Sequence, residues 1–452
     1  MKKHTVDMTT GGIYSRIITF AIPIILTGVL QVLYNAADMV VIGRFSGKTS
    51  LAAVGSTSSA INLVINLFIG ISSAAGIIVA RKFGAKNESG VSKAVHTSVS
   101  VSIIGGLLLS VLGIAIARPL MRIMGSPDDV IDLSVLYLRI YFIGVFPMMI
   151  YNFGASIIRS VGDSKRPLIY LSLSGLINVL LNLVFVILLK WDVAGVAAAT
   201  AIAQFISAVL VLRNLLKTSE CYKLVWKKLR IYQNDLFDIL YIGIPAGIQG
   251  SVFSLSNVII QSSINAAGAV AMAGNAAAGN IEGFAYTSMN AFHQAAVTFI
   301  SQNFGAMKFD RIKKGIIAAC VSVGITGLLV GGSICIFANK LLSIYVTDLD
   351  VIACGRERMM IICSTYFLCG LMEVGVAGLR GIGSSLLPMI ISILGVCGIR
   401  MVMVISSGPY TDIDSLKILY LSYPVSWIVT EVIHFITFAV LYSKKKRTLQ
   451  KI

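Results

Sequence analysis

Charged residues are scarce in this chain, and acidic ones are the scarcest. Only 13% of its 452 residues are charged, with 20 Asp and Glu against 37 Lys and Arg, whereas 56% are hydrophobic and the mean hydropathy is +0.87. About a quarter of the residues of an average soluble domain are charged. The composition therefore excludes a soluble globular protein and indicates a polytopic membrane protein.

Motifs of catalysis and metal binding are lacking as well. The seven cysteines form no CxxC pair and are read as small apolar residues, and the four histidines are scattered, so we expect no metal centre. No HExxH, GxSxG or paired-Asp motif lies on an apolar run, which argues against an intramembrane enzyme. A protein that is not an enzyme and needs no cofactor is predicted.

Long apolar runs, in contrast, recur from end to end. A helix crosses ~30 Å of hydrocarbon with roughly 20 residues, and about twelve runs reach that length. The first three cover 17–42, 51–80 and about 95–117, and the others are centred near residues 146, 180, 203, 255, 286, 324, 367, 393 and 429. We predict an all-α fold of twelve transmembrane helices. The first run is too long for the core of a cleaved signal peptide, so we expect it to remain as the first helix.

The basic residues are unevenly distributed. Most Lys and Arg fall at the two ends and in alternate connections, whereas Asp348, Asp350, Asp412 and Asp414 lie in connections on the other side. This positive-inside pattern predicts a multi-pass protein of the cell inner (plasma) membrane with both termini cytoplasmic. The excess of positive charge therefore reflects membrane lipids as partners and not nucleic acid.

The chain repeats itself at an offset of about 221 residues. The FGA tripeptide at 83–85 recurs at 304–306, and the Arg-x-x-Gly motif at 159–162 recurs at 380–383. Six spans in each half give both halves the same orientation. They predict two six-helix lobes related by a pseudo-twofold axis along the membrane normal, with a cleft between them.

The repeat predicts the domain boundaries. We expect an N-lobe at 1–217, a basic cytoplasmic linker at 218–234 that lies on the inner leaflet, and a C-lobe at 235–452. Pro23 and Pro245 occupy matching places in the first helix of each lobe. Each removes one backbone hydrogen bond, so both are candidate hinges, although a fixed kink fits the sequence equally well.

Polar residues follow one face of the first helix and recur on the fifth and sixth. They are Gln31, Tyr34, Asn35 and Asp38 on the first, Asn178 and Asn182 on the fifth, and Thr200 and Gln204 on the sixth. If these faces converge, amide and hydroxyl groups surround Asp38, and the cluster can bind a proton or Na⁺. The alternative is that Asp38, close to Arg44, extends to the outer interface.

Three further acidic residues lie within apolar runs, where a lone carboxylate costs roughly 2.5–3.5 kcal/mol. Glu282, near Asn280 in the eighth helix, is predicted to bind the cationic part of a substrate or a proton, with a structural hydrogen bond as the alternative. Glu373 is interpreted as locally paired, near Arg380, or exposed at the interface. For Glu431 a functional and a structural role stay equally open. The substrate cleft is expected to include Gln31, Tyr34, Asn35, Gln204, Asn280 and Glu282.

These residues, in this order, resemble the multidrug and toxic compound extrusion (MATE) family of bacterial type. The resemblance extends from Pro23 and Asp38 through the two FGA tripeptides and the Asn280–Gly283 segment to Tyr423–Trp427. It implies a secondary antiporter that exports small organic, cationic or amphipathic compounds against an inward proton or Na⁺ gradient by alternating access. We expect it to act as a monomer.

The resemblance also implies the ion-coupling residues Asp38, Asn178, Asn182 and Thr200. Some members carry a second carboxylate where this chain has Asn182, so the departure favours protons over Na⁺. Acidic residues that some members carry in the other lobe are Phe253 and Cys369 here. The alternative function is a flippase for lipid-linked oligosaccharides or lipid precursors. A flippase should line its cleft with several Arg or Lys, whereas the apolar runs here offer mainly Arg139 and Arg400.

Overall fold

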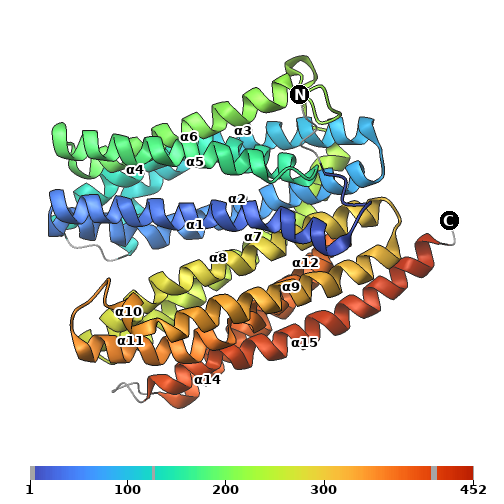
Figure 1. The fold of residues 1–452 in the computed structure, drawn as a ribbon. Coiled ribbons are helices and arrows are strands. Elements are labelled where there is room, and N and C mark those ends of the chain that lie inside the picture. Colours follow the sequence, from blue (N-terminus) through green and yellow to red (C-terminus); the bar gives the residue numbers. More distant parts are fainter. Residues whose placement is uncertain (1–5, 125–127, 409–414, 451–452) are drawn as a thin grey trace. The chain divides into compact units, whose positions relative to one another are not determined.

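The computed structural model describes residues 6–124, 128–408 and 415–450 (Figure 1). His4, Asp412 and Asp414 lie outside the described residues. The described chain is helical and contains no β-strand, so the predicted all-α fold is confirmed. The α-helices are α1 (Ile13–Phe45), α2 (Lys48–Gly84), α3 (Glu88–Ile123), α4 (Asp128–Ser160), α5 (Lys165–Asn182), α6 (Asp192–Lys217), α7 (Gln233–Ala266), α8 (Ala269–Gly305), α9 (Phe309–Ile336), α10 (Ala338–Leu342), α11 (Leu349–Ile362), α12 (Tyr366–Gly381), α13 (Leu386–Ser392), α14 (Ile399–Ser407) and α15 (Leu416–Leu449).

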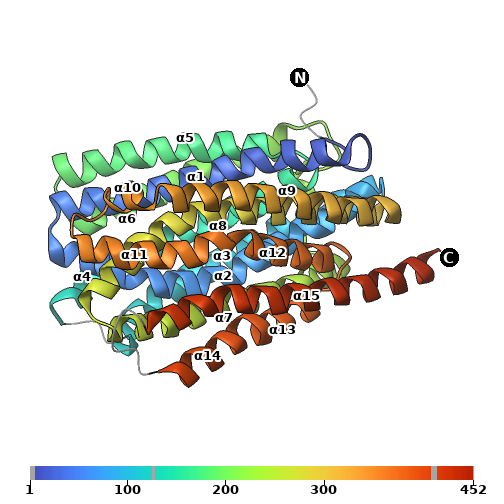
Figure 2. The ribbon, with the colours of Figure 1, turned by 60° about the horizontal axis from the view of Figure 1, so that its bottom comes forward.

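Four short segments of other helical types interrupt or join these helices. Two are π-helical turns, η1 (Leu183–Leu188) and η4 (Ile393–Gly398), and two are 3₁₀ turns, η2 (Trp226–Lys228) and η3 (Cys363–Thr365). Through η3, α11 and α12 continue as one span, Leu349–Gly381 (Figure 2). In the same way, α13, η4 and α14 form another span.

Within the described residues, eleven helical segments are long and apolar enough to cross a membrane. The remaining long helix, α8, has 37 residues but is not among the eleven, since it carries side chains such as Asn275, Glu282 and His293. These side chains are buried, and α8 packs against α9, α11 and α12, so protein covers much of its polar surface. With α8, all twelve predicted spans are helical.

The helices gather into two compact units. Unit 1 consists of Val29–Gly247 with the described residues before Met8, and unit 2 consists of Met8–Gly28 with the described residues from Ile248 onward. Both α1 and α7 therefore divide, α1 after Gly28 and α7 after Gly247. The predicted lobes, 1–217 and 235–452, follow the repeat along the sequence, and their boundaries stay a prediction.

The first half of each divided helix packs closely on its unit. A Cβ atom added to Gly28 would lie 2.0 Å from Cγ2 of Thr287 on α8, and one added to Gly247 would lie 2.6 Å from Cα of Leu67 on α2. Only glycine permits these approaches.

The backbone repeats as the sequence does. Gly47 and Gly268, which precede α2 and α8, have φ of 89° and 96°. Gly162 and Gly383, which follow α4 and α12, have φ of 90° and 88°. A residue with a Cβ atom is strained at such positive φ angles, whereas glycine is not. The two halves thus need glycine at equivalent turns, as two copies of one fold should.

Candidate functional site

The four predicted ion-coupling residues lie together in unit 1. Asp38 comes from α1, Asn178 and Asn182 from α5, and Thr200 from α6. Nδ2 of Asn182 donates a hydrogen bond to Oδ1 of Asp38. The amide of Asn178 fits in two orientations. In one it donates to Oγ1 of Thr200 at 3.3 Å, and in the other it donates to Oδ1 of Asp38 at 3.0 Å and accepts from the backbone N of Thr200 at 3.3 Å.

Local structure positions this cluster. Asn178 and Asn182 are one helical turn apart, so their side chains share a face of α5. The π turn η1 begins directly after Asn182, and such turns are frequent at functional sites. The ring of Tyr34 packs over Gly175, where a Cβ atom would lie 1.9 Å from Cε2, and its hydroxyl donates to the carbonyl of Ser172 at 3.2 Å. These contacts hold α1 close to α5.

The electrostatics of the cluster leave a charge to be balanced. Asp38 is half-buried, Asn178 is 5% exposed and Asn182 is 1% exposed. Among the described residues no Lys, Arg or His forms an ion pair with Asp38. The Oδ1 atom of Asn182 is buried and finds no hydrogen-bond partner there either. Neutral amides thus surround one carboxylate, for which a proton or a small cation is the available counter-charge.

The residues predicted for the substrate cleft are distributed over both units. Gln31, Asn35 and Asn280 are exposed, and Tyr34 and Gln204 are half-buried. Glu282 differs from them because it is buried and lies in an ion pair. Their role in substrate binding stays a prediction.

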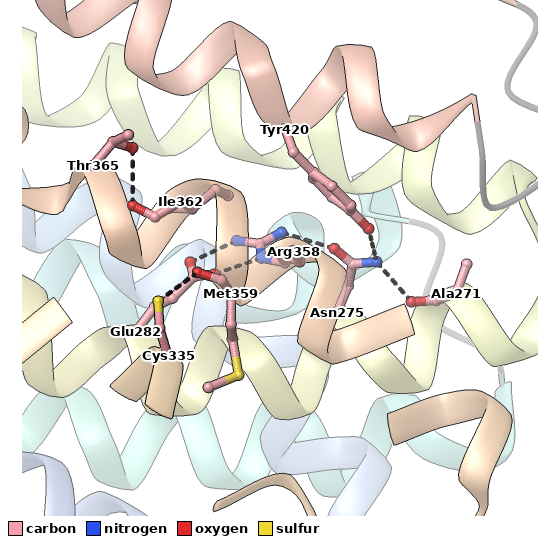
Figure 3. A network of polar contacts seen from close by, with 9 residues as sticks. All are labelled: Ala271, Asn275, Glu282, Cys335, Arg358, Met359, Ile362, Thr365 and Tyr420. Carbon is pink, nitrogen blue, oxygen red and sulfur yellow. Dashed lines mark hydrogen bonds and ion pairs between the residues drawn. The ribbon is translucent and has the colours of Figure 1, made fainter. Parts of the chain in front are cut away.

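Glu282 belongs to a buried polar network in unit 2 that Arg358 joins together (Figure 3). Nε and Nη2 of Arg358 on α11 donate to the two carboxylate oxygens of Glu282 at 2.7 and 2.8 Å. Nη1 of Arg358 donates to Asn275 at 2.9 Å, and Nδ2 of Asn275 donates to the hydroxyl of Tyr420 at 2.7 Å. This bidentate pair supports the structural interpretation of Glu282, since Arg358 already balances its charge.

Sequence reasoning missed Arg358. The expectation that the apolar runs offer mainly Arg139 and Arg400 is wrong, because Arg358 and Arg380 are also buried within spans, whereas Arg139 is exposed. The available signal was the presence of basic residues inside an apolar run, since Arg356, Arg358 and Arg380 all lie in the run that forms α11 and α12.

The other two acidic residues differ in their surroundings. Oε2 of Glu373 lies 2.9 Å from Nδ1 of His293, so the buried Glu373 pairs with α8. Arg380, its predicted neighbour, donates to Oε1 of Gln249 at 2.9 Å. Glu431 is half-buried on α15.

The fold and these buried sites define a polytopic α-helical membrane protein with a duplicated core. The sequence profile of the MatE family matches residues 23–184 and again residues 245–405. The chain therefore belongs to the MatE family and is a membrane transporter, not an enzyme. The double match confirms the predicted duplication.

The sequences and structures of known proteins are similar to most or nearly all of this chain. The chain is 29% identical over 441 residues to "Probable multidrug resistance protein YoeA" of Bacillus subtilis, covering 95% of this chain and 94% of the relative. It is 21% identical to "Multidrug export protein MepA" of Staphylococcus aureus, covering 79% of each. The solved structure "Outward-facing conformation of a multidrug resistance MATE family transporter of the MOP superfamily" superposes with a TM-score of 0.90 at 21% identity, covering 98% of this chain and 99% of that chain.

Proposed function

We propose that this transporter exports small, drug-like organic molecules by antiport, and that the Asp38 cluster carries the coupling ion. Relatives named for multidrug resistance and multidrug export support the exporter over the flippase. The substrates are cationic or amphipathic, the protein acts as a monomer in the cell inner membrane, and both termini are cytoplasmic.

This proposal is based on one structural observation. Four polar residues from α1, α5 and α6 form one hydrogen-bonded cluster: Asp38, Asn178, Asn182 and Thr200. A coupling site needs a group that holds its ion in one state and releases it in the other. A half-buried carboxylate with neutral partners meets that need, because no fixed cation competes with the ion.

The coupling ion is a proton. The amide nitrogen of Asn182 points at the carboxylate while its oxygen points away, and one orientation of Asn178 does the same. Sodium requires several oxygen ligands directed at one point, by analogy with other hard cations. The amide of Asn182 would therefore have to turn, and so would that of Asn178 in the orientation that donates to Asp38. Protonation of Asp38 requires no new ligand.

Transport in inside-out vesicles tests the proposal, with ethidium as substrate and an imposed proton gradient. Asp38→Asn should lower gradient-driven ethidium uptake at least about tenfold, because the amide carries no exchangeable charge. The control is Asp310→Asn, which removes a carboxylate that is 87% exposed and pairs with Lys446, and it should transport as the wild type does. Undiminished proton-driven transport by Asp38→Asn would refute the proposed site.

A second arrangement of the same vesicles separates the two ions. A sodium gradient imposed at constant pH should drive little ethidium transport. Transport that follows the sodium gradient, and is lost in Asp38→Asn, would keep the site but replace the proton by Na⁺.

A further inference from the structure

Arg400 is a buried cation in unit 2 that forms no ion pair among the described residues. It lies on α14, directly after the π turn η4, and is 6% exposed. Its guanidinium lies over the ring of Tyr423, 4.0 Å from the centroid, and 5.7 Å from that of Trp427. Nε donates to Oγ of Ser426 at 3.0 Å. Its side chain is thus held in one place by α15.

Arg400 has no acidic partner among the described residues. By comparison, all three guanidinium nitrogens of Arg358 donate hydrogen bonds, to Glu282 and Asn275. The two terminal nitrogens of Arg400 donate to no side chain or carbonyl in the part of the chain that the structure describes. An uncompensated charge within a membrane span is costly and usually marks a binding site.

The aromatic surroundings favour one kind of ligand. Tyr423 lies within cation–π distance of Arg358 as well, at 5.8 Å, and Trp427 contacts Tyr366 at 5.4 Å between ring centroids. A guanidinium stacked on a ring keeps its edge free. That edge matches the two oxygens of a carboxylate, sulfonate or phosphate in a bidentate pair. Tyrosine and tryptophan rings beside it suit a flat apolar body.

The π turn before Arg400 is a second observation that points to a site. In both units the fifth helix of the repeat contains a π turn, η1 in one and η4 in the other. The first directly follows Asn182 of the Asp38 cluster, and the second directly precedes α14 and Arg400. Such turns cost backbone hydrogen-bond geometry and persist mostly where function requires them.

We infer that Arg400 binds the anionic group of an exported aromatic molecule, so that the transporter accepts anionic and zwitterionic compounds as well as cations. The Arg400 site, as we name it, consists of Arg400, Tyr423, Ser426 and Trp427. The inference that exported substrates bind here rests on the proposed export function. The inference that the site binds an anion does not depend on that function.

The first experiment uses Trp427 as a reporter and needs no transport. The chain has three tryptophans, and the other two, Trp191 and Trp226, are exposed. With both changed to phenylalanine, quenching of Trp427 by iodide measures the access of an anion to the site, and quenching by neutral acrylamide measures access alone. Arg400→Gln should lower the iodide quenching constant severalfold and leave the acrylamide constant unchanged.

The second experiment uses a matched pair of dyes, a rhodamine with a free benzoate and its methyl ester. They share one ring system and differ in the anionic group. In purified full-length protein, Arg400→Gln should weaken binding of the free acid about 10-fold to 100-fold, as expected for a hydrogen-bonded charge, and change binding of the ester by less than about threefold. Arg400→Lys should recover part of the loss, since it keeps the charge without the planar fork.

Arg356→Gln is the matched control, because Arg356 is an exposed arginine of the same unit. It should change neither quenching nor binding. Equal loss of both dyes in Arg400→Gln, no loss of either, or unchanged iodide quenching would each overturn the inference. Intact anion binding together with absent dye export in wild-type vesicles would instead overturn the export function and leave the Arg400 site in place.

Discussion

The carboxylate of Glu282 binds the guanidinium of Arg358 in the structure, although it was expected to bind the cationic part of a substrate. The pair is buried, bidentate and joined to Asn275, so each charge depends on the other. Removal of one member of such a pair typically costs about 3–5 kcal/mol, because it leaves an uncompensated charge inside the protein.

Glu282→Gln should therefore lower the stability of the protein in detergent by several kcal/mol, seen as a fall in the melting temperature. It should reduce transport of cationic and neutral compounds alike. The double variant Glu282→Gln with Arg358→Gln should be more stable than Glu282→Gln alone, since no charge is left unpaired. Glu431→Gln, at a half-buried position, is the control. If Glu282→Gln kept its stability and lost only cations, Glu282 would bind substrate after all.

The residues of the Asp38 cluster differ from the partner of Glu282 in how well the sequence predicts them. That Asp38, Asn178, Asn182 and Thr200 lie close together could be predicted, because each polar group stands out in an apolar run and helical spacing puts the two asparagines on one face. Their role in ion coupling stays a prediction. The partner of Glu282 could not be predicted in this way. Arg358 is on a helix far along the chain, and a local pattern does not reveal which distant helix packs against it.

At the scale of elements, the two helices with matched prolines are also the two that divide between the units. Pro23 lies in the half of α1 before Gly28, and Pro245 lies just before the division of α7 at Gly247. Near Pro23, the hydroxyl of Thr27 donates to the proline carbonyl at 2.7 Å. A weakened backbone where a helix passes from one compact unit to another supports the hinge interpretation.

Pro23→Ala should restore the backbone donor to the carbonyl of Thr19 and stiffen α1. We expect equilibrium binding of a fluorescent substrate to stay within about twofold while the transport rate falls severalfold, because no binding group is lost and the rate depends on the movement. Both quantities are measured in the same vesicles. Pro147→Ala is the control, since α4 lies wholly within unit 1. A wild-type rate for Pro23→Ala would make the proline a fixed kink.

At the scale of the whole molecule, the proposed topology places the connection between α6 and α7 in the cytoplasm. Cys221 lies in this connection, outside the membrane spans, and is half-buried. Burial raises the pKa of the Cys221 thiol, and the charges of Glu88 and Glu220 raise it further. The thiolate, which is the reactive form, is therefore scarcer at a given pH than for an ordinary thiol.

A membrane-impermeant maleimide should thus label Cys221 in inside-out vesicles and not in intact cells. Labelling should be slow near neutral pH. Its rate should still rise with pH in the alkaline range where the labelling rate of an ordinary thiol no longer rises, because the pKa of Cys221 is raised. The six other cysteines lie on helices within the spans, and Cys221→Ser identifies their background. Labelling of Cys221 in intact cells would reverse the orientation.

The polar side chains of α8 affect how this helix enters the membrane during synthesis. Helices leave the ribosome in order, so Glu282 reaches the membrane well before Arg358 is synthesised. On its own, α8 partitions poorly into lipid, because the translocon admits segments according to their hydrophobicity. Its stable insertion therefore waits for α11, which brings the counter-charge. A nascent chain that ends after α9 should leave α8 accessible to aqueous reagents, and the lengthening of that chain past Arg358 should withdraw it into the bilayer.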